Sequence, residues 1–293
     1  MVSLRDLVAR ELAEPVDPKV SAMAAAIAAE HGDASRAVLF YGSCLRQKQF
    51  DSLMLDFYLI VSDYRAAYPK RWLAVANRMI PPNVFYFEHR GLAAKYAVLS
   101  EADFAHECSP GAWTVSTVAR FAQPALLVWS ADERAGEAVI AVVSKAAPTL
   151  LSWTLPHFGG GDVINLWKLA FAKTFAAELR AERSDRSASI VEAEPDRYRR
   201  VGEAVLAQLD ESALMGPGQA SRWWRAKQVK GKAYSIVRLA KASFTFAGGA
   251  DYIAWKINRH AGTHIELKPW QRRWPLLAAL SLLPRLLRSG AVR

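Results

Sequence analysis

The sequence predicts an α+β protein, with a mixed sheet domain, a helical middle region and a basic helical C-terminal segment. Three observations predict this class. Short apolar runs rich in aromatic and β-branched residues alternate with helical stretches over about the first 130 residues. Helical periodicity dominates after that point, and Lys and Arg gather near the C-terminus. The 293 residues suffice for a substantial core, and no run reaches the ~18 uninterrupted apolar residues of a membrane-spanning helix.

The elements follow from local pattern and from Pro and Gly breaks. Strands are expected at 36–41, 55–61, 83–88, 96–99 and 125–129. Helices are expected at 3–32 with an interruption near Pro15 and Pro18, and at 65–79, 101–121, 137–147, 166–182 and 196–209, with a loop at 184–189. The sequence MGPGQ at 215–219 indicates a boundary. Three segments result: 1–130, 131–216 and 217–293.

The charge of the chain is strongly asymmetric. Residues 217–293 hold fifteen Lys and Arg against only Asp251 and Glu266, a net charge of +13. Because the whole chain carries +10, the first 216 residues carry −3. A mildly acidic body with a basic tail predicts a polyanionic partner, either nucleic acid or an anionic lipid surface.

Large apolar residues in the tail favour the membrane over nucleic acid. Trp223, Trp224 and Trp255 are interleaved with the basic residues, and residues 274–283 are apolar except for Ser281. This run is too short to span a bilayer and suits shallow insertion, with arginines on the lipid phosphates. A C-terminal helix packed on the body would show the same pattern over 274–287, so that alternative stays open. Only two cysteines are present, which gives no disulfide scaffold.

One short motif suggests chemistry. A predicted strand ends in Gly42-Ser43, and Asp56 lies inside the next apolar run. A Gly-Ser turn after a strand presents backbone N–H groups and a hydroxyl to a phosphate, and a carboxylate on a neighbouring strand can hold a divalent metal against it. Nucleotidyltransferases use this arrangement, but an ordinary turn has the same local sequence.

Further segments agree with one family. They are MLDFYLIV at 54–61, VFYFEH at 84–89, KYAVLS at 95–100, ARFAQPALLVW at 119–129 and RAKQVKGKAYSIVRLAKASFTFAGG at 225–249. In this order they resemble the mitochondrial-type phosphatidate cytidylyltransferases, the translocator assembly and maintenance family of CDP-diacylglycerol synthases. The resemblance covers most of the chain, with weak identity between the motifs.

The resemblance implies a nucleotidyltransferase domain over 1–130, a winged-helix-like middle region and a membrane-contacting C-terminal segment. It implies the reaction of CTP with phosphatidic acid to give CDP-diacylglycerol and pyrophosphate, with Mg²⁺ as the cofactor. The protein would be peripheral, on the cytoplasmic side of the inner membrane. Its partners would be CTP, phosphatidic acid and an anionic membrane surface, and nucleic acid is not favoured.

The resemblance also implies roles for single residues. Ser43, Asp56 and Lys95 would be catalytic, with Asp56 also binding metal. Substrate-binding roles fall on Gly42 and Ser43 at the CTP phosphates, on Tyr96 and Arg120, and on Lys230 and Arg238 at the lipid headgroup. The sequence departs from the family where Ala97 and Ala119 replace glycines of its Lys-Tyr-Gly and Gly-Arg motifs.

The metal site is short of ligands. Many nucleotidyltransferases carry two acids separated by one residue on a strand, but Met54 occupies the partner position here. Asp51 and Glu88 are the candidates to complete the site with Asp56. Three functions stay open: the lipid cytidylyltransferase, a nucleotidyltransferase with another phosphorylated or RNA acceptor, and a non-catalytic lipid-binding protein with a degenerate domain.

Overall fold

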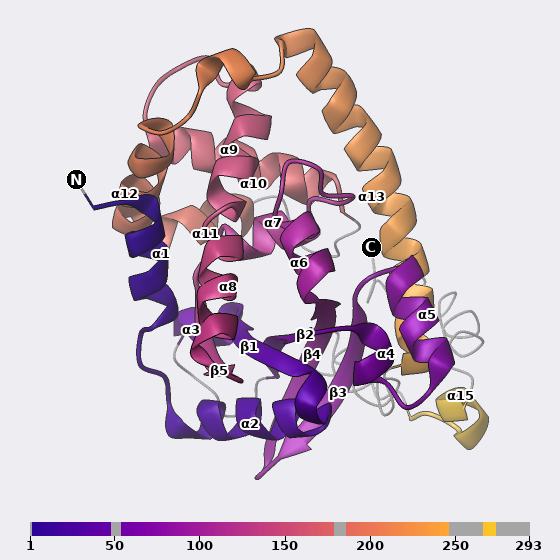
Figure 1. The fold of residues 1–293 in the computed structure, drawn as a ribbon. Coiled ribbons are helices and arrows are strands. Elements are labelled where there is room, and N and C mark those ends of the chain that lie inside the picture. The colour runs from indigo at the N-terminus through magenta and orange to yellow at the C-terminus, as the bar shows by residue number, and fades with distance from the viewer. Residues whose placement is uncertain (1, 48–53, 179–185, 246–265, 274–293) are drawn as a thin grey trace.

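The centre of the protein is a five-stranded mixed sheet with strand order β3-β4-β2-β1-β5 (Figure 1). The computed structural model describes residues 2–47, 54–178, 186–245 and 266–273. Strands β2 and β4 are parallel, and the other neighbouring pairs are antiparallel. The predicted α+β class is confirmed. The strands are β1 (Ser35–Tyr41), β2 (Leu55–Val61), β3 (Asn83–His89), β4 (Leu92–Ser100) and β5 (Ala125–Ser130). Only β4 begins well before its predicted start.

Helices surround this sheet. In the N-terminal part they are α1 (Leu4–Leu12), α2 (Pro18–Ala29), α3 (Ser43–Gln47), α4 (Tyr64–Ala67), α5 (Arg71–Met79), α6 (Glu101–Glu107) and α7 (Ser116–Phe121). They continue with α8 (Glu133–Val143), α9 (Ala146–Thr154), α10 (Val163–Ala176), α11 (Arg186–Glu192), α12 (Pro195–Leu206), α13 (Pro217–Thr245) and α15 (Pro269–Arg273). Short 3-10 turns lie at Gly32–Ala34, Leu155–His157 and Glu211–Ala213.

Proline and glycine explain most of the boundaries. Pro18 occupies the first turn of α2 and the Asp17 side chain accepts from Lys19 N–H, so the predicted interruption near 15–18 is confirmed. The stretches 65–79 and 101–121 are each two helices, separated near Pro69 and Pro110. The predicted loop at 184–189 is wrong in part, because α11 begins at Arg186.

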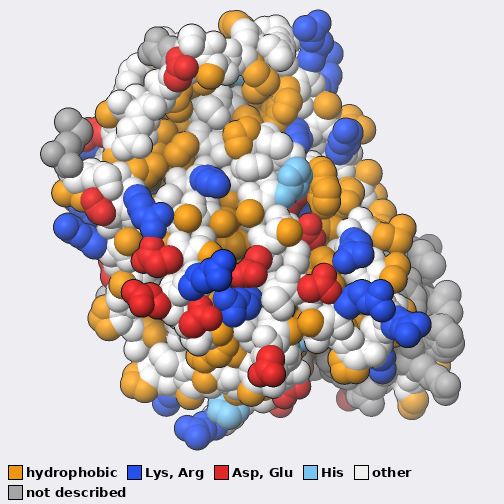
Figure 2. All heavy atoms as spheres, viewed as in Figure 1, with side chains coloured by type: hydrophobic (Ala, Val, Ile, Leu, Met, Phe, Trp, Pro, Cys, Tyr) orange, Lys and Arg blue, Asp and Glu red, His pale blue; other side chains and the backbone are white. Residues whose placement is uncertain are grey.

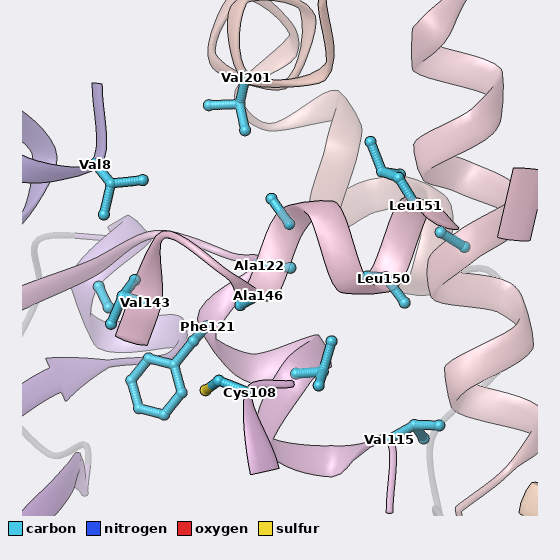
Figure 3. Packing of buried hydrophobic residues seen from close by; sticks show 14 of the residues in the cluster. Val8, Cys108, Val115, Phe121, Ala122, Val143, Ala146, Leu150, Leu151 and Val201 are labelled. Atoms are coloured by element: carbon cyan, nitrogen blue, oxygen red, sulfur yellow. The ribbon is translucent and has the colours of Figure 1, made fainter. Parts of the chain in front are cut away.

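Two hydrophobic cores lie on the two faces of the sheet. Alternate side chains of a strand point to opposite faces, so neighbouring residues enter different cores. One core contains Phe57 and Tyr96 together with residues of α2, α4 and α5. The larger core contains Tyr41 and Tyr58 together with residues of α1 and α7 to α12. Figure 3 shows part of this larger core, where Val8, Phe121, Val143 and other apolar side chains converge from different helices.

The larger core joins the three predicted segments. Its residues run from Leu4 in the first segment through Leu150 in the second to Trp224 on α13. Among the described residues, one helical stretch, Glu133–His157, is long and apolar enough to cross a membrane, but half of it is buried. Its buried side chains, such as Leu150, belong to this core. Packing inside the protein therefore accounts for the buried half of this stretch.

Helix α13 packs on the 3-10 turn at Leu155–His157 and on β3, and runs down one flank of the molecule toward α5 (Figure 1). It begins at Pro217, inside the predicted boundary sequence. Trp224 is buried and donates from Nε1 to Trp153 O at 2.8 Å. A Cβ on Gly231 would lie 2.1 Å from Ala177 O, so only glycine permits this close approach. The apolar terminus at 274–287 lies outside the described residues.

Candidate active site

The Gly42-Ser43 turn and Asp56 lie against each other. Gly42 has φ of +98°, a conformation that favours glycine, and follows the last residue of β1. A Cβ at Gly42 would lie 2.7 Å from Asp56 Oδ2. Any side chain at position 42 would therefore meet the carboxylate as well as strain the backbone. The predicted pairing of the Gly-Ser turn with a carboxylate on the neighbouring strand is present.

Sheet register places a base beside this acid. Tyr41 of β1 is opposite Asp56 of β2, and Asp56 is opposite Lys95 of β4. Residues in register share a face of the sheet, so the three side chains project together. Lys95 Nζ lies 3.0 Å from Asp56 Oδ1, with side-chain exposures of 41% and 16%. The acid is recessed, and the lysine reaches solvent above it.

The ion pair with Lys95 leaves the Asp56 carboxylate able to accept a further hydrogen bond or to bind a cation. Asp56 Oδ1 is buried, and although Lys95 Nζ is at ion-pair distance, no donor among the described residues reaches this oxygen in hydrogen-bonding geometry. A buried carboxylate oxygen without a hydrogen bond is unusual in folded proteins. It marks Asp56 as a position where a ligand donor or a cation would be stabilised.

Arg120 of α7 adds a second positive charge. Its Cζ lies 4.7 Å from the centroid of the Tyr41 ring. Burial acts to lower the pKa of Arg120, but Tyr41, Tyr58 and Asp56 outweigh it and the pKa is raised. Burial, with Asp56, in turn raises the pKa of Tyr41 well above its ordinary value. Arg120 therefore stays cationic and Tyr41 stays a neutral phenol.

Arg238 of α13 approaches the same face. Its Nε donates to Pro81 O at 2.7 Å, and its guanidinium also donates to Ser116 Oγ at 3.2 Å, at the start of α7. Burial raises the pKa of Tyr58, whereas Arg120 and Arg238 both act to lower it. Both guanidinium groups are therefore within electrostatic reach of one side chain on the Asp56 face.

Lys230 does not join this group. It is exposed on α13, eight residues before Arg238. At a rise of 1.5 Å per residue, that separation is about 12 Å along the helix. The predicted pairing of Lys230 and Arg238 at one headgroup is therefore not seen.

Tyr96 faces away from the site, so its predicted substrate role is wrong. It follows Lys95 on β4, and alternation sends its side chain to the other face of the sheet. There it is 6% exposed within the second core, and its hydroxyl lies 3.2 Å from His31 Nε2. Burial raises the pKa of Tyr96 above its ordinary value. It is a packing residue.

Glu88 does not lie beside Asp56, and the prediction that places it there is wrong. Strand β4 stands between β2, which carries Asp56, and β3, which carries Glu88. Glu88 is exposed and accepts a hydrogen bond from the Tyr86 hydroxyl. The other predicted ligand, Asp51, lies outside the described residues. Within the described part of the chain no group of three or more His, Cys, Asp or Glu side chains could hold a metal.

Cys44, next to Ser43, is a packing residue. It is 1% exposed and its Sγ lies 3.4 Å from Met54 O. Burial, followed by the charge of Asp56, raises the pKa of its thiol. The thiol therefore stays protonated at neutral pH.

Sequence reasoning misses Tyr41 and Tyr58, which flank Arg120. Tyr41 directly precedes the Gly-Ser turn, and Tyr58 lies two residues after Asp56, on the same strand face. Alternation from Asp56 could have found Tyr58. The approach of Arg238 had no local signal, because it depends on where α13 packs.

A separate cavity of about 460 Å³ lies among the helices. Its lining comes from α1, α9, α12, α13 and neighbouring loops and includes Leu4, Trp153, Met215 and Trp223. None of the residues around Asp56 lines it, and its wall is mainly apolar. The charges that could act on a phosphate are gathered at the sheet, so this cavity is not the candidate active site.

Comparisons with known proteins assign no family to this chain. No protein-family model matches the chain, and no curated protein matches it in sequence. Among solved structures, it is similar to a nucleotidyltransferase-like protein from Exiguobacterium sibiricum, with 9% identity and a TM-score of 0.29 over 92% of each chain.

Proposed function

We propose that this protein is a phosphatidate cytidylyltransferase that acts at an anionic membrane surface. In the reaction, a phosphate oxygen of phosphatidic acid attacks the α-phosphorus of CTP. The bond to the β-phosphate oxygen breaks, and the products are CDP-diacylglycerol and pyrophosphate. The observation that carries the proposal is the recessed Asp56 carboxylate, which lies against the Gly42 turn and beside Lys95.

The site suits a metal that arrives with its nucleotide. Mg²⁺ in proteins often uses only one or two carboxylates and completes its shell with water and substrate phosphates. Asp56 offers one carboxylate, with an oxygen that accepts no hydrogen bond from the described residues. A single acid is a poor site for a resident ion, but it fits a magnesium–triphosphate complex. When bound, Mg²⁺ would neutralise phosphate charge.

The bases around Asp56 fit the charge that this reaction assembles. A phosphomonoester and a triphosphate repel each other, so cations must offset the charge in the transition state. Lys95 is half-exposed beside the acid, and Arg120 is held cationic above Tyr41. Ser43 supplies a hydroxyl and an N–H at the turn. These groups would bind and orient phosphates.

The lipid acceptor is supported by the chain beyond the sheet. Segment 217–293 has a net charge of +13 and contains the apolar run 274–283, whereas Trp224 is buried in the larger core and does not contribute to a lipid-facing surface. Helix α13 places Arg238 within electrostatic reach of Tyr58, on the Asp56 face. A headgroup phosphate held near this helix would be close to the candidate site.

A second candidate is a lipid-binding protein without catalysis. It is favoured by Met54, which stands where many nucleotidyltransferases carry a second acid, and by the neutralising pair of Asp56 with Lys95. The sequence also leaves open a nucleotidyltransferase with another phosphorylated or RNA acceptor. One assay separates the three functions.

The assay supplies the full chain with CTP labelled at its α-phosphate, Mg²⁺ and vesicles that contain phosphatidic acid. We expect label in the organic phase and an equal amount of pyrophosphate, both abolished by EDTA. Turnover only with a soluble phosphomonoester or RNA would indicate another acceptor. Vesicle binding without any turnover would favour the non-catalytic candidate.

Asp56→Asn tests the central residue. It removes one charge with little change in volume, and we expect turnover to fall at least ~100-fold, the scale at which a lost electrostatic contact acts on a transition state. The control is Asp196→Asn on α12, where the carboxylate is 82% exposed. Full turnover in Asp56→Asn would reject the proposed role of this acid.

A further inference from the structure

Helix α5 presents an apolar outward face that the proposed reaction does not use. Its exposed side chains are Arg71, Trp72, Val75, Arg78 and Met79, which share one side of the helix. Trp72 is 48% exposed, Val75 56% and Met79 69%. The opposite side of α5 carries the buried residues. The outward face of α5 therefore presents three large apolar side chains together with two arginines.

This exposure is concentrated rather than scattered. Single exposed apolar side chains are normal on a soluble protein, but a contiguous group marks an interaction surface. Of the ten large apolar side chains that are exposed in the described part of the chain, three lie on this nine-residue helix. Much of their apolar surface stays in contact with water.

The helix is fixed firmly to the sheet. Asn77 is fully buried and donates from Nδ2 to Val98 O at 3.0 Å. Asn83, at the start of β3, donates from Nδ2 to Leu73 O at 3.0 Å, and its N–H donates to the Asn77 side chain. Tyr234 of α13 donates to Met79 O at 3.2 Å. The outward face is therefore pre-organised.

The charge around this face is positive. No acidic residue occurs between positions 64 and 87, whereas Arg65, Lys70, Arg71 and Arg78 lie in that stretch. The nearest acid in contact is Asp63, whose carboxylate lies 3.5 Å from Arg78. Figure 2 shows Lys and Arg side chains gathered with hydrophobic ones over α5, at the right of the view.

We propose that the outward face of α5 docks on an anionic lipid bilayer. Trp72, Val75 and Met79 would enter the headgroup region, with Arg71 and Arg78 on the lipid phosphates, as interfacial helices do. A symmetric contact with a second copy of the chain fits less well, because it would bring the arginines of two copies together. This docking does not rest on the proposed reaction, since it needs neither nucleotide nor phosphatidic acid.

A site-specific probe tests the contact. Cys44 and Cys108 are both buried, so Val75→Cys supplies one accessible thiol for an environment-sensitive fluorophore. With phosphatidylcholine vesicles that contain phosphatidylglycerol, and with no CTP, we expect a blue shift and quenching by nitroxide-labelled lipids. The matched control is Leu206→Cys on α12, which is 39% exposed and should show neither change. An unchanged probe at position 75 would overturn the proposal, whether or not the protein binds vesicles.

Two sets of substitutions complete the test, each after thermal unfolding has shown a folded protein. Combined Trp72→Ser, Val75→Ser and Met79→Ser should lower vesicle partitioning at least tenfold, and Leu206→Ser should not. Arg71→Gln with Arg78→Gln should weaken binding only to anionic vesicles, whereas Arg199→Gln with Arg200→Gln on α12 should not. Unchanged partitioning of the serine variant, or its conversion of a dimer into a monomer in sedimentation, would contradict bilayer docking.

Discussion

At the Asp56 end of the sheet, the two faces differ sharply although the same strands build them and a hydrophobic core lies on each. On one face, Asp56 and Lys95 form a recessed ion pair beside the Gly42 turn. On the other face, the next residues along the same strands, Phe57 and Tyr96, lie in a closed apolar core. A shift of one position therefore exchanges a charged, partly open environment for a dry one. Position along a strand says little about function until the face is known.

The largest difference in stability is expected between substitutions of Phe57 and of its neighbour Asp56. Phe57 is 0% exposed, so Phe57→Ala should lower the free energy of unfolding by about 3–5 kcal/mol. Asp56→Ala should change stability far less, because it leaves no large apolar cavity, yet should abolish turnover. Urea denaturation and the cytidylyltransfer assay measure the two effects. Equal loss of stability in both variants would contradict the distinction between the faces.

A smaller effect is expected at Gly42. Gly42→Ala imposes a side chain at φ +98° and sets its Cβ 2.7 Å from Asp56 Oδ2. We expect a loss of about 1–3 kcal/mol in unfolding free energy, together with lower turnover. Gly91→Ala is the control, since Gly91 also has positive φ but nothing lies within 4 Å of its Cβ. The excess loss at Gly42 measures the contact with the carboxylate.

Lys241 differs from Lys95 in its partners, because the Nζ of Lys95 pairs with a carboxylate and the Nζ of Lys241 contacts backbone carbonyls. Its Nζ donates to Pro82 O at 2.8 Å and to Ile80 O, and burial, followed by Arg238, lowers its pKa to about 7. Between pH 7 and about 10 the unfolded chain therefore binds more protons than the folded one. Stability should rise with pH across this window, by up to about 1.4 kcal/mol per unit from this group.

The check for Lys241 is urea denaturation at pH 7, 8 and 9. The slope of unfolding free energy against pH should flatten in Lys241→Met. Lys232→Met is the control, because that lysine is exposed on the same helix. An identical slope in the Lys241 variant and the parent protein would show that this lysine does not titrate there.

The smallest effect concerns the neighbours Lys95 and Tyr96. Tyr96→Phe removes a hydroxyl that lies 3.2 Å from His31 Nε2 and should cost about 1 kcal/mol of stability without changing turnover. Lys95→Met should do the reverse, with little change in stability and a large fall in turnover. Loss of turnover in Tyr96→Phe, with the fold intact, would show that the Tyr96 hydroxyl contributes to the reaction.

Local sequence predicts the elements well because their causes are local. Short apolar runs mark all five strands, and Pro18 marks the start of α2. Two predicted helices fail because a local break was overlooked, as at Pro69 between α4 and α5. The Gly42 turn is also a local signal, since a positive φ favours glycine.

The candidate site was only partly predictable. The pairing of Asp56 with the Gly42 turn followed from two adjacent strands in sequence. The same reasoning could not show that β4 separates Glu88 from Asp56, because strand order depends on long-range packing. Nor could it show that Arg238 donates to Pro81 O, since that contact joins residues 157 positions apart.

The sequence by itself determined the α+β class, the strand positions, the asymmetry of charge and the glycine turn beside an acid. Tertiary structure alone decided which neighbours share a face, which base lies beside Asp56 and which side of α5 stays outside. The physical reason is that backbone preference and side-chain alternation act over a few residues. Contacts between distant segments are set by how the two cores on the sheet are filled.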